Sequence, residues 1–317
     1  MLKTAVLILS AANLLTQAGG NPPRLEPRAL KSWSQNTVQV PPINDLESQC
    51  DRNGNLYFHL NTNEVLFLSA DGKQGHKFTL SEEEKRGFQN FSLSPSGDLY
   101  VLTLVNREYE VLTFDDDGVL RHPVTLQVPD NTFNDKFLAF DDGTVLFRGF
   151  FDEGAPSKMQ GKSYTALFEA SGKLRKQLNA ASDDLPDVSK IGALHDGAVA
   201  MGEDGNAYVL SSQGITVISE NGLLVRRFDV HKPDPKELAY KIYVSGEAIA
   251  VVLKNLDGSR ITRDDFLLLD ATTGEPFGLY SAPPETGTND VCYSRQEGFT
   301  FLRSEKGQDS LIKVPLN

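Results

Sequence analysis

Acidic and amide side chains recur just before an apolar segment about once every fifty residues. One from each recurrence forms the set Asp45, Asn90, Asp135, Asp187, Glu237 and Asp290. If these oxygens converge, they could coordinate a hard cation such as Ca²⁺, which takes roughly six to eight oxygen ligands. They could equally hydrogen-bond a polar or cationic small molecule, and Asn and Asp also initiate turns for purely structural reasons. Asp135 and Asp290 are the candidate metal ligands of the set.

A repeated pair of glycine turns sets the elements that must position these residues. The first turn precedes an apolar strand at Gly54, Gly97, Gly143, Gly205, Gly246 and Gly298, and the second follows a later strand at Gly72, Gly118, Gly172, Gly222 and Gly274. A period near fifty residues with several short strands per copy indicates a β-propeller. We predict an all-β, six-bladed propeller over residues 37–317, with four antiparallel strands per blade.

The sixth copy is shorter than the others. The copies span approximately 43–80, 88–128, 134–178, 187–230, 237–280 and 289–317. The last offers three strands, which would leave a blade edge unpaired. The β-rich segment Thr37–Val40 precedes the first copy, so we predict that this N-terminal strand completes the last blade and closes the ring.

The two faces of the predicted ring differ in their loops. In an antiparallel blade, the glycine turns between strands 1–2 and 3–4 lie on one face, and the 2–3 loops and blade connectors lie on the other. Extended 2–3 loops are expected at about Phe150–Ser163 and Lys254–Asp265. Because function concentrates on loops held by a rigid scaffold, we expect a ligand or partner to bind this second face. The first strands line the central channel, so the acid and amide ring would surround its mouth.

The N-terminus has the pattern of a secretory signal peptide over residues 1–18. Lys3 precedes the mostly apolar stretch Ala5–Leu15, and a small-residue cleavage site ends at Ala18. The apolar stretch is shorter than the roughly 20 residues that span a bilayer. The Pro-rich segment 19–36 is expected to be a linker. We therefore predict export to the periplasm or the extracellular space, without a membrane span.

Two cysteines, Cys50 and Cys292, fall on the expected first strands of the first and last blades. These blades are neighbours in a closed ring, and export permits a disulfide. Counted back from each turn glycine the two cysteines differ by two residues, which is about 7 Å along a strand. Disulfide geometry tolerates little offset, so a bond and a pair of free thiols both stay open.

Charge and motifs exclude several classes of function. The formal net charge of −12 argues against a nucleic-acid partner, because phosphate neutralisation needs clustered Lys and Arg. The five histidines show no metal-ligand spacing, and no nucleophile elbow, Walker loop, CxxC pair or dinucleotide fingerprint occurs. The partner is therefore expected to be a small polar ligand or another protein.

The phrase Asp51–Tyr57, of the form D-x-x-G-N-L-Y, resembles the turns of six-bladed propellers of the NHL-repeat and SMP-30/gluconolactonase type. In gluconolactonase-like enzymes, channel Glu, Asn and Asp side chains hold a divalent metal that polarises the lactone carbonyl. Residues of suitable type for this role are Asn134 or Asp135, Asp187, Glu237, and Asn289 or Asp290. They do not match the family's motifs one by one, and the family's early Glu-Gly-Pro motif is absent. The sequence thus supports an exported, non-catalytic binding propeller, with a Ca²⁺-type hydrolase or lactonase as the alternative.

Overall fold

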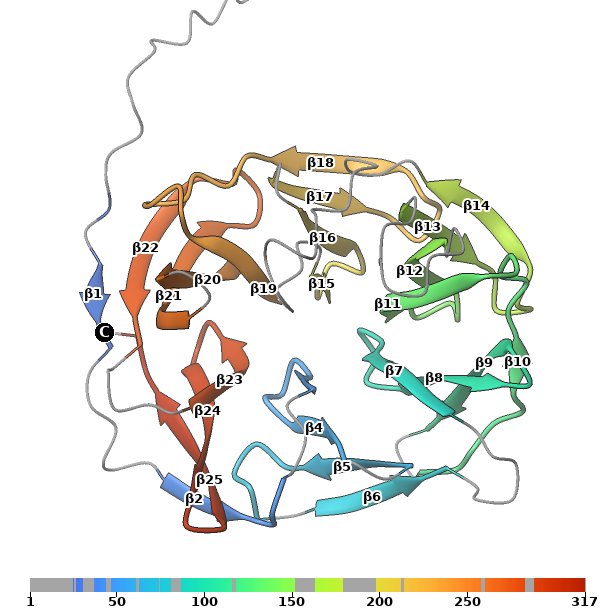
Figure 1. Cartoon of the computed structure of the whole chain (residues 1–317), viewed down its shortest axis with the longest axis horizontal. Helices are drawn as coiled ribbons and strands as arrows, with labels where there is room; N and C mark the ends of the chain where they lie inside the picture. The colour runs from blue at the N-terminus through green and yellow to red at the C-terminus, as the bar shows by residue number, and fades with distance from the viewer. Residues whose placement is uncertain are drawn as a thin grey trace, which may run out of the picture.

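The structure, a computed structural model, describes residues 25, 27–30, 37–43, 47–60, 63–73, 75–80, 87–115, 118–151, 163–178, 198–211, 214–257, 260–282 and 288–316. Six sheets surround a central axis like the blades of a propeller (Figure 1). Within the described part of the chain, no helix is long and apolar enough to cross a membrane. The predicted signal peptide at 1–18 lies outside the described residues.

Each blade begins at the central axis and runs outward in chain order. The strands of blades 1 to 3 are β3 (Ser48–Cys50), β4 (Leu56–His59), β5 (Glu64–Leu68), β6 (Gly75–Thr79), β7 (Gly87–Leu93), β8 (Leu99–Val105), β9 (Glu108–Phe114), β10 (Val124–Thr125), β11 (Thr132–Ala139), β12 (Val145–Phe151), β13 (Ser163–Phe168) and β14 (Leu174–Leu178). Those of blades 4 to 6 are β15 (Val199–Met201), β16 (Ala207–Ser211), β17 (Gly214–Ile218), β18 (Leu224–Phe228), β19 (Leu238–Ser245), β20 (Ala248–Asp257), β21 (Arg260–Asp270), β22 (Pro276–Ser281), β23 (Thr288–Ser294), β24 (Gly298–Glu305) and β25 (Gln308–Val314). Two N-terminal strands, β1 (Arg28–Ala29) and β2 (Thr37–Val40), join blades 5 and 6.

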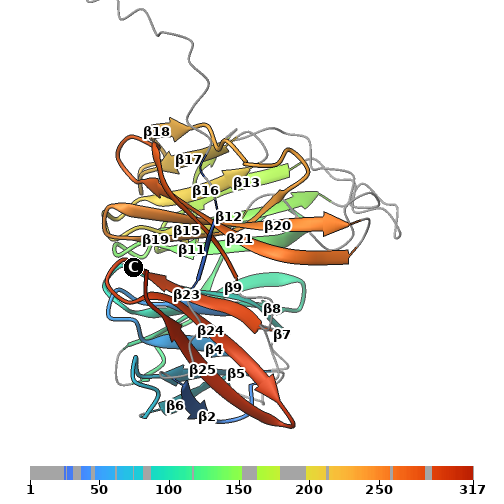
Figure 2. The ribbon, with the colours of Figure 1, turned by 90° about the vertical axis from the view of Figure 1, so that its left-hand side faces the viewer.

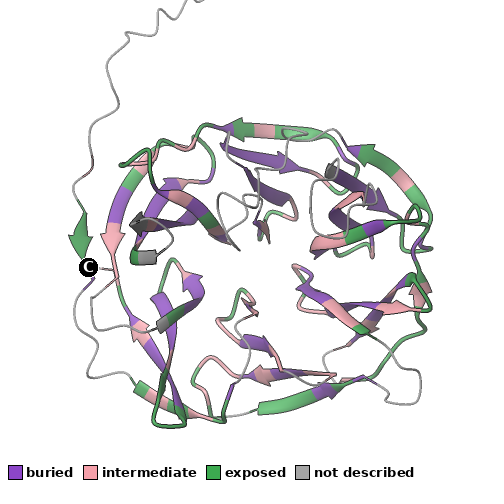
Figure 3. Ribbon diagram, viewed as in Figure 1, coloured by how far each residue is buried: buried purple, intermediate pink, exposed green. Residues whose placement is uncertain are grey.

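The core lies between the blades rather than within any one of them. Both faces of a middle strand meet a neighbouring blade, and β16 and β17 are accordingly buried at every residue. Outer strands such as β14 are mostly exposed (Figure 3). Between blades 2 and 3, the buried rings of Tyr109 and Phe147 meet edge to face with centroids 5.0 Å apart. Such edge-to-face aromatic contacts stabilise the packing of adjacent blades.

The glycine turns have the backbone conformation that their spacing predicts. All eleven glycines of the two turn series have positive φ angles, which other residues seldom adopt. Gly172 also allows a close approach between blades. A Cβ on Gly172 would lie 2.0 Å from the carbonyl oxygen of Thr125, and the Gln127 amide donates to the Gly172 carbonyl oxygen at 2.9 Å. The turn of blade 3 thus packs directly on the outer strand of blade 2.

Replacing Gly172 by Ala is expected to destabilise the protein by roughly 2–4 kcal/mol, because backbone strain and displacement of the Thr125 carbonyl add together. Gly205→Ala is the matched control. Gly205 has a φ of 75° against 80° for Gly172, and no atom lies within 4 Å of its added Cβ. This control should lose only about 1 kcal/mol from strain. Urea unfolding midpoints measure both, and equal losses would contradict the inter-blade contact.

The predicted N-terminal closure of the ring is confirmed. β2 pairs antiparallel with β25, from Thr37 opposite Ile312 to Val40 opposite Asp309. The half-buried Val40 and the buried Ile43 pack in the cluster between blades 6 and 1. The Ile43 amide donates to the Asp309 carboxylate. This segment therefore both completes blade 6 and ties it to blade 1.

A second N-terminal contact was not anticipated from the sequence. Within the segment expected to be a linker, β1 adds a parallel strand to β22 of blade 5. The next residue, Leu30, is buried against residues of blades 5 and 6, among them Phe266 and Phe301. The N-terminal segment therefore contacts the edges of two adjacent blades.

Cys50 and Cys292 form a disulfide with a Cα–Cα separation of 5.6 Å. The offset expected from counting does not exist, because the two hairpins differ at their turns. Cys50 pairs with Leu56 and Cys292 with Thr300, and each partner is the second residue after its turn glycine. In blade 6 the two extra residues are paired ones, since Tyr293 lies opposite Phe299 and Ser294 opposite Gly298 before the turn. Both cysteines therefore have the same position relative to their second strands.

Blade 5 differs from expectation in its 2–3 connection. The expected long loop over Lys254–Asp265 is instead a hairpin, in which β20 and β21 stay paired as far as Asp257 opposite Arg260. Cross-strand charge supports the extension, since Lys254 lies opposite Asp264. Figure 2 shows these strands reaching beyond their neighbours on one face of the ring. In blade 3, residues 152–162 of the other expected loop lie outside the described residues.

Candidate ligand-binding channel

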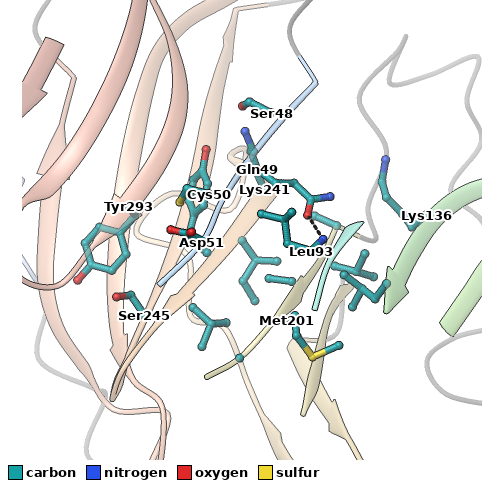
Figure 4. Close-up of a pocket in the computed structure, with 18 of the residues that line it drawn as sticks. Ser48, Gln49, Cys50, Asp51, Leu93, Lys136, Met201, Lys241, Ser245 and Tyr293 are labelled. Carbon is teal, nitrogen blue, oxygen red and sulfur yellow. Dashed lines mark hydrogen bonds between the residues drawn. The ribbon is translucent and has the colours of Figure 1, made fainter. Parts of the chain in front are cut away.

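A cavity of about 630 Å³ lies along the axis of the ring, and the first strands of all six blades contribute to its wall. Figure 4 shows side chains converging on it from several blades, including Lys241 from β19 and Lys136 from β11. The first strands all enter from the face of the connectors and 2–3 loops. We call the end of the cavity on that face the connector end, and the opposite end, at the glycine turns, the turn end.

Most of the charged and amide side chains of the wall lie at the connector end, and they are Glu47, Asn90, Lys136, Lys241, Lys254, Asn289 and Asp290. The turn end has a smaller charged group, which is Asp51, Arg52 and Glu203. The middle of the wall is more apolar, with Leu93, Phe137 and Ile242. This arrangement of an apolar wall with a few convergent polar groups is typical of small-molecule sites.

Asp290 is the centre of the most buried polar cluster on the wall. The Tyr243 hydroxyl lies 2.8 Å from Asp290 Oδ2 and 3.0 Å from its carbonyl oxygen. Lys241 Nζ donates to the same carbonyl oxygen at 3.0 Å and lies 3.7 Å from Oδ2. Burial raises the pKa of Tyr243 well above its usual range, so this hydroxyl stays a donor. Burial lowers the pKa of Lys241, and the Asp290 charge partly opposes this effect.

Lys254 approaches the same end of the cavity from β20. Its ammonium donates to Asp264 Oδ2 at 2.7 Å and lies 5.0 Å from the centroid of the Tyr240 ring. Only 9% of Lys254 is exposed. Burial raises the pKa of Asp264, and the Lys254 ammonium opposes the shift. This short ion pair holds Lys254 in place at the base of the long hairpin.

A second carboxylate network lies within blade 5. Asn255 Nδ2 donates at 3.0 Å both to Glu237 Oε1 and to Asp265 Oδ2. Arg263 and Ser281 also donate to Asp265. Glu237 and Asp265 are each only 1% exposed, and burial raises the pKa of Glu237. The network fixes the entry of β19 against the base of the hairpin.

The site residues predicted from the sequence do not all line the cavity. Asn90 and Asp290 line the cavity, whereas Asp135 and Glu237 are not part of its wall. Asp45 and Asp187 lie outside the described residues. Asn90 Nδ2 donates to the Asp135 carbonyl oxygen at 3.2 Å, which joins blades 2 and 3.

The donor set for a divalent metal is not assembled among the described residues. No three His, Cys, Asp or Glu side chains within them are placed to hold one ion. The two candidates have protein partners, since Asp135 is 3.5 Å from Lys136 Nζ and Asp290 is engaged by Tyr243 and Lys241. We therefore assign neither carboxylate as a metal ligand and derive no step through a metal.

The channel lysines were not identified as site residues from the sequence, and β-bulges explain part of this. In β11 the register shifts between Asn134 and Lys136, which leaves Asp135 as the extra residue. A bulge re-aims side chains, and here Lys136 faces the channel instead of Asp135. A usable signal existed for Lys241, which is a lone charge within an otherwise apolar first strand.

These observations define a closed six-bladed β-propeller with a polar-ended central channel. No family model matches the sequence, and no curated protein matches it either. Among solved structures, the chain is similar to a gluconolactonase from Xanthomonas campestris, with 14% identity, coverage of 94% of this chain and 96% of that one, and a TM-score of 0.49.

Two further solved structures are similar in the same way. The calcium-binding protein regucalcin from Agrobacterium tumefaciens has 13% identity, coverage of 92% of this chain and 96% of that one, and a TM-score of 0.49. Virginiamycin B lyase from Staphylococcus aureus has 12% identity, coverage of 88% and 99%, and a TM-score of 0.44. The activities in these names belong to those proteins.

Proposed function

We propose that this protein is an exported binding propeller that holds a small polar ligand at the connector end of its central channel. The observation that carries the proposal is the cavity of about 630 Å³, with most of its charged and amide side chains at the connector end. That volume lies within the range of small-molecule sites, about 300–1,000 Å³. The apolar middle of the wall would contact the body of the ligand, and the connector-end groups would orient it.

Several of the polar groups are held in place before any ligand binds. Tyr243 fixes Asp290, and Asp264 fixes Lys254 through a 2.7 Å contact. The disulfide and the inter-blade hydrogen bonds also keep the first strands in register. Preorganised groups lose little conformational entropy on binding, which favours affinity for a rigid polar ligand.

A cavity-filling variant tests the proposal. Ala200 of β15 lines the cavity, and Ala200→Phe should occupy part of it. Leu224→Phe is the control, because Leu224 is 66% exposed on the outer strand β18. Thermal unfolding is followed with glycolate, malate, citrate, glucose and spermidine as probes. At least one probe should raise the midpoint of the wild type and of Leu224→Phe, but not that of Ala200→Phe.

Two outcomes would contradict channel binding. One is that none of the probes raises the midpoint, and the other is that Ala200→Phe responds as strongly as the wild type. Elemental analysis of the same samples distinguishes the hydrolase alternative. A stoichiometric divalent ion, together with a midpoint that rises on addition of Ca²⁺, would favour that alternative instead.

A further inference from the structure

We propose that Lys241 is a covalent attachment point, at which the channel captures an aldehyde or ketone ligand as an imine. The inference rests on the proposed channel function and adds the chemical class of the ligand, a small carbonyl compound. It is carried by the position of one amine on the cavity wall, by its difference from the other channel lysines, and by the carboxylate beside it.

The amine of Lys241 has access to the cavity, and its ion pair with Asp290 is longer than a hydrogen bond. Its hydrogen bond goes to a backbone carbonyl oxygen at 3.0 Å, and the nearest Asp290 carboxylate oxygen is 3.7 Å away. One quarter of the side chain is exposed, and the residue lines the cavity. Partial burial favours the neutral, nucleophilic form of an amine. The other charged or titratable groups acting on it are Lys254, Glu47 and Tyr243.

The two other lysines of the wall are less suited to this chemistry. Lys254 Nζ is held by Asp264 at 2.7 Å and is almost fully buried. Lys136 has 36% of its side chain exposed, against 25% for Lys241, and lies 3.5 Å from the Asp135 carboxylate. Lys241 is therefore more buried than Lys136, and its carboxylate contact is longer than that of Lys254.

The surroundings also suit the product. The free amine adds to the carbonyl carbon, and loss of one water from the adduct leaves a protonated imine. Overall, R–NH₃⁺ and O=CHR′ give R–NH⁺=CHR′ and H₂O, so charge and atoms balance. The Asp290 carboxylate, fixed by the Tyr243 hydroxyl at 2.8 Å, would lie beside the iminium nitrogen as its counter-ion. A fixed opposite charge in a partly buried site stabilises such a cation.

Reductive trapping tests the attachment point directly. The full chain is incubated with glyoxylate and cyanoborohydride, which transfers hydride to the imine carbon and leaves a stable carboxymethyl-lysine. Peptide mapping by mass spectrometry gives the rate at each lysine. Lys241 should be modified about 10-fold faster than Lys136 in the wild type. Equal rates at the two lysines, or faster modification of Lys136 or Lys254, would overturn the proposal.

Two variants test the surroundings of the amine. Asp290→Asn keeps the shape and can still accept the Tyr243 hydrogen bond, but removes the counter-ion. The rate at Lys241 should fall about 10-fold, whereas an unchanged or higher rate would contradict the counter-ion role. Lys136→Arg keeps the charge at a neighbouring position of the same cavity and should leave the Lys241 rate unchanged. Thermal unfolding of each variant verifies that it is folded.

A further comparison separates failure of the inference from failure of channel binding. Glycolate resembles glyoxylate but has no carbonyl to form an imine. If glycolate protects Lys241 from trapping while Ala200→Phe slows the trapping, the ligand binds in the channel. If glycolate raises the unfolding midpoint but glyoxylate leaves Lys241 unmodified, channel binding stands and the covalent step is wrong.

Discussion

Replacing Thr37–Val40 by Gly-Pro-Gly-Pro is expected to lower the thermal unfolding midpoint by about 10 °C. The replacement keeps the length of the chain but removes β2 from the edge of β25. Val38 and Val40 would lose their half-buried environment, and the backbone pairing to blade 6 would be lost. Together these losses amount to roughly 3–5 kcal/mol.

Strand β2 contributes more stability than its length suggests, because it packs on two blades. Val38 approaches the glycine turn of blade 1, where a Cβ on Gly72 would lie 2.8 Å from its side chain. Ile43 follows directly and is held by Asp309. Gln39→Thr is the control, since Gln39 is exposed and its backbone pairing is kept. This control should shift the midpoint by less than about 2 °C, and an equally stable Gly-Pro variant would show that β2 does not close the ring.

Removing the disulfide by Cys50→Ala together with Cys292→Ala is expected to cost about 2–5 kcal/mol of unfolding free energy. The bond joins residues separated by 242 positions and so restricts the unfolded chain strongly. It also joins β3 to β23, which are the first strands of blades 1 and 6, the two blades between which the ring closes. The measurement is the denaturant midpoint under oxidising conditions.

Reduction provides the control for this variant. Dithiothreitol should lower the midpoint of the wild type and leave the double variant unchanged. Because β2 and the disulfide both join blade 6 to blade 1, the losses of unfolding free energy should not be additive. The combined variant should lose more than the sum of the two, by at least about 0.5 kcal/mol. Equal midpoints for the wild type and the double variant would contradict a stabilising role for the bond.

Much of the fold was predictable because its signals are local. A positive φ at a hairpin turn requires glycine or a near equivalent, so each of Gly54 to Gly298 marks a turn regardless of the rest of the chain. Short apolar strands between such turns cannot bury both faces alone, and stacking around a ring satisfies them. The sixth copy of the repeat has three strands where the others have four, and Thr37–Val40 was the segment able to supply the fourth.

The candidate site was less predictable, because it depends on register. One extra residue in a first strand changes which side chain faces the channel, and such bulges occur in β7, β11, β19 and β23. Asp135 was expected at the channel, and Lys136 lines it instead. Glu237 was expected there as well, but it is buried under the blade 5 hairpin. Neither outcome can be read from composition or spacing.

By itself, the sequence determined the number of blades, the phase of the turns and the source of the closing strand, since glycine conformation and strand periodicity act over a few residues. Only the tertiary structure decided that Cys50 and Cys292 share a register, and that Lys241, Tyr243 and Asp290 meet on one wall. Those contacts join strands about fifty or more residues apart. They depend on bulges, turn lengths and blade angles, which are settled only when the ring closes.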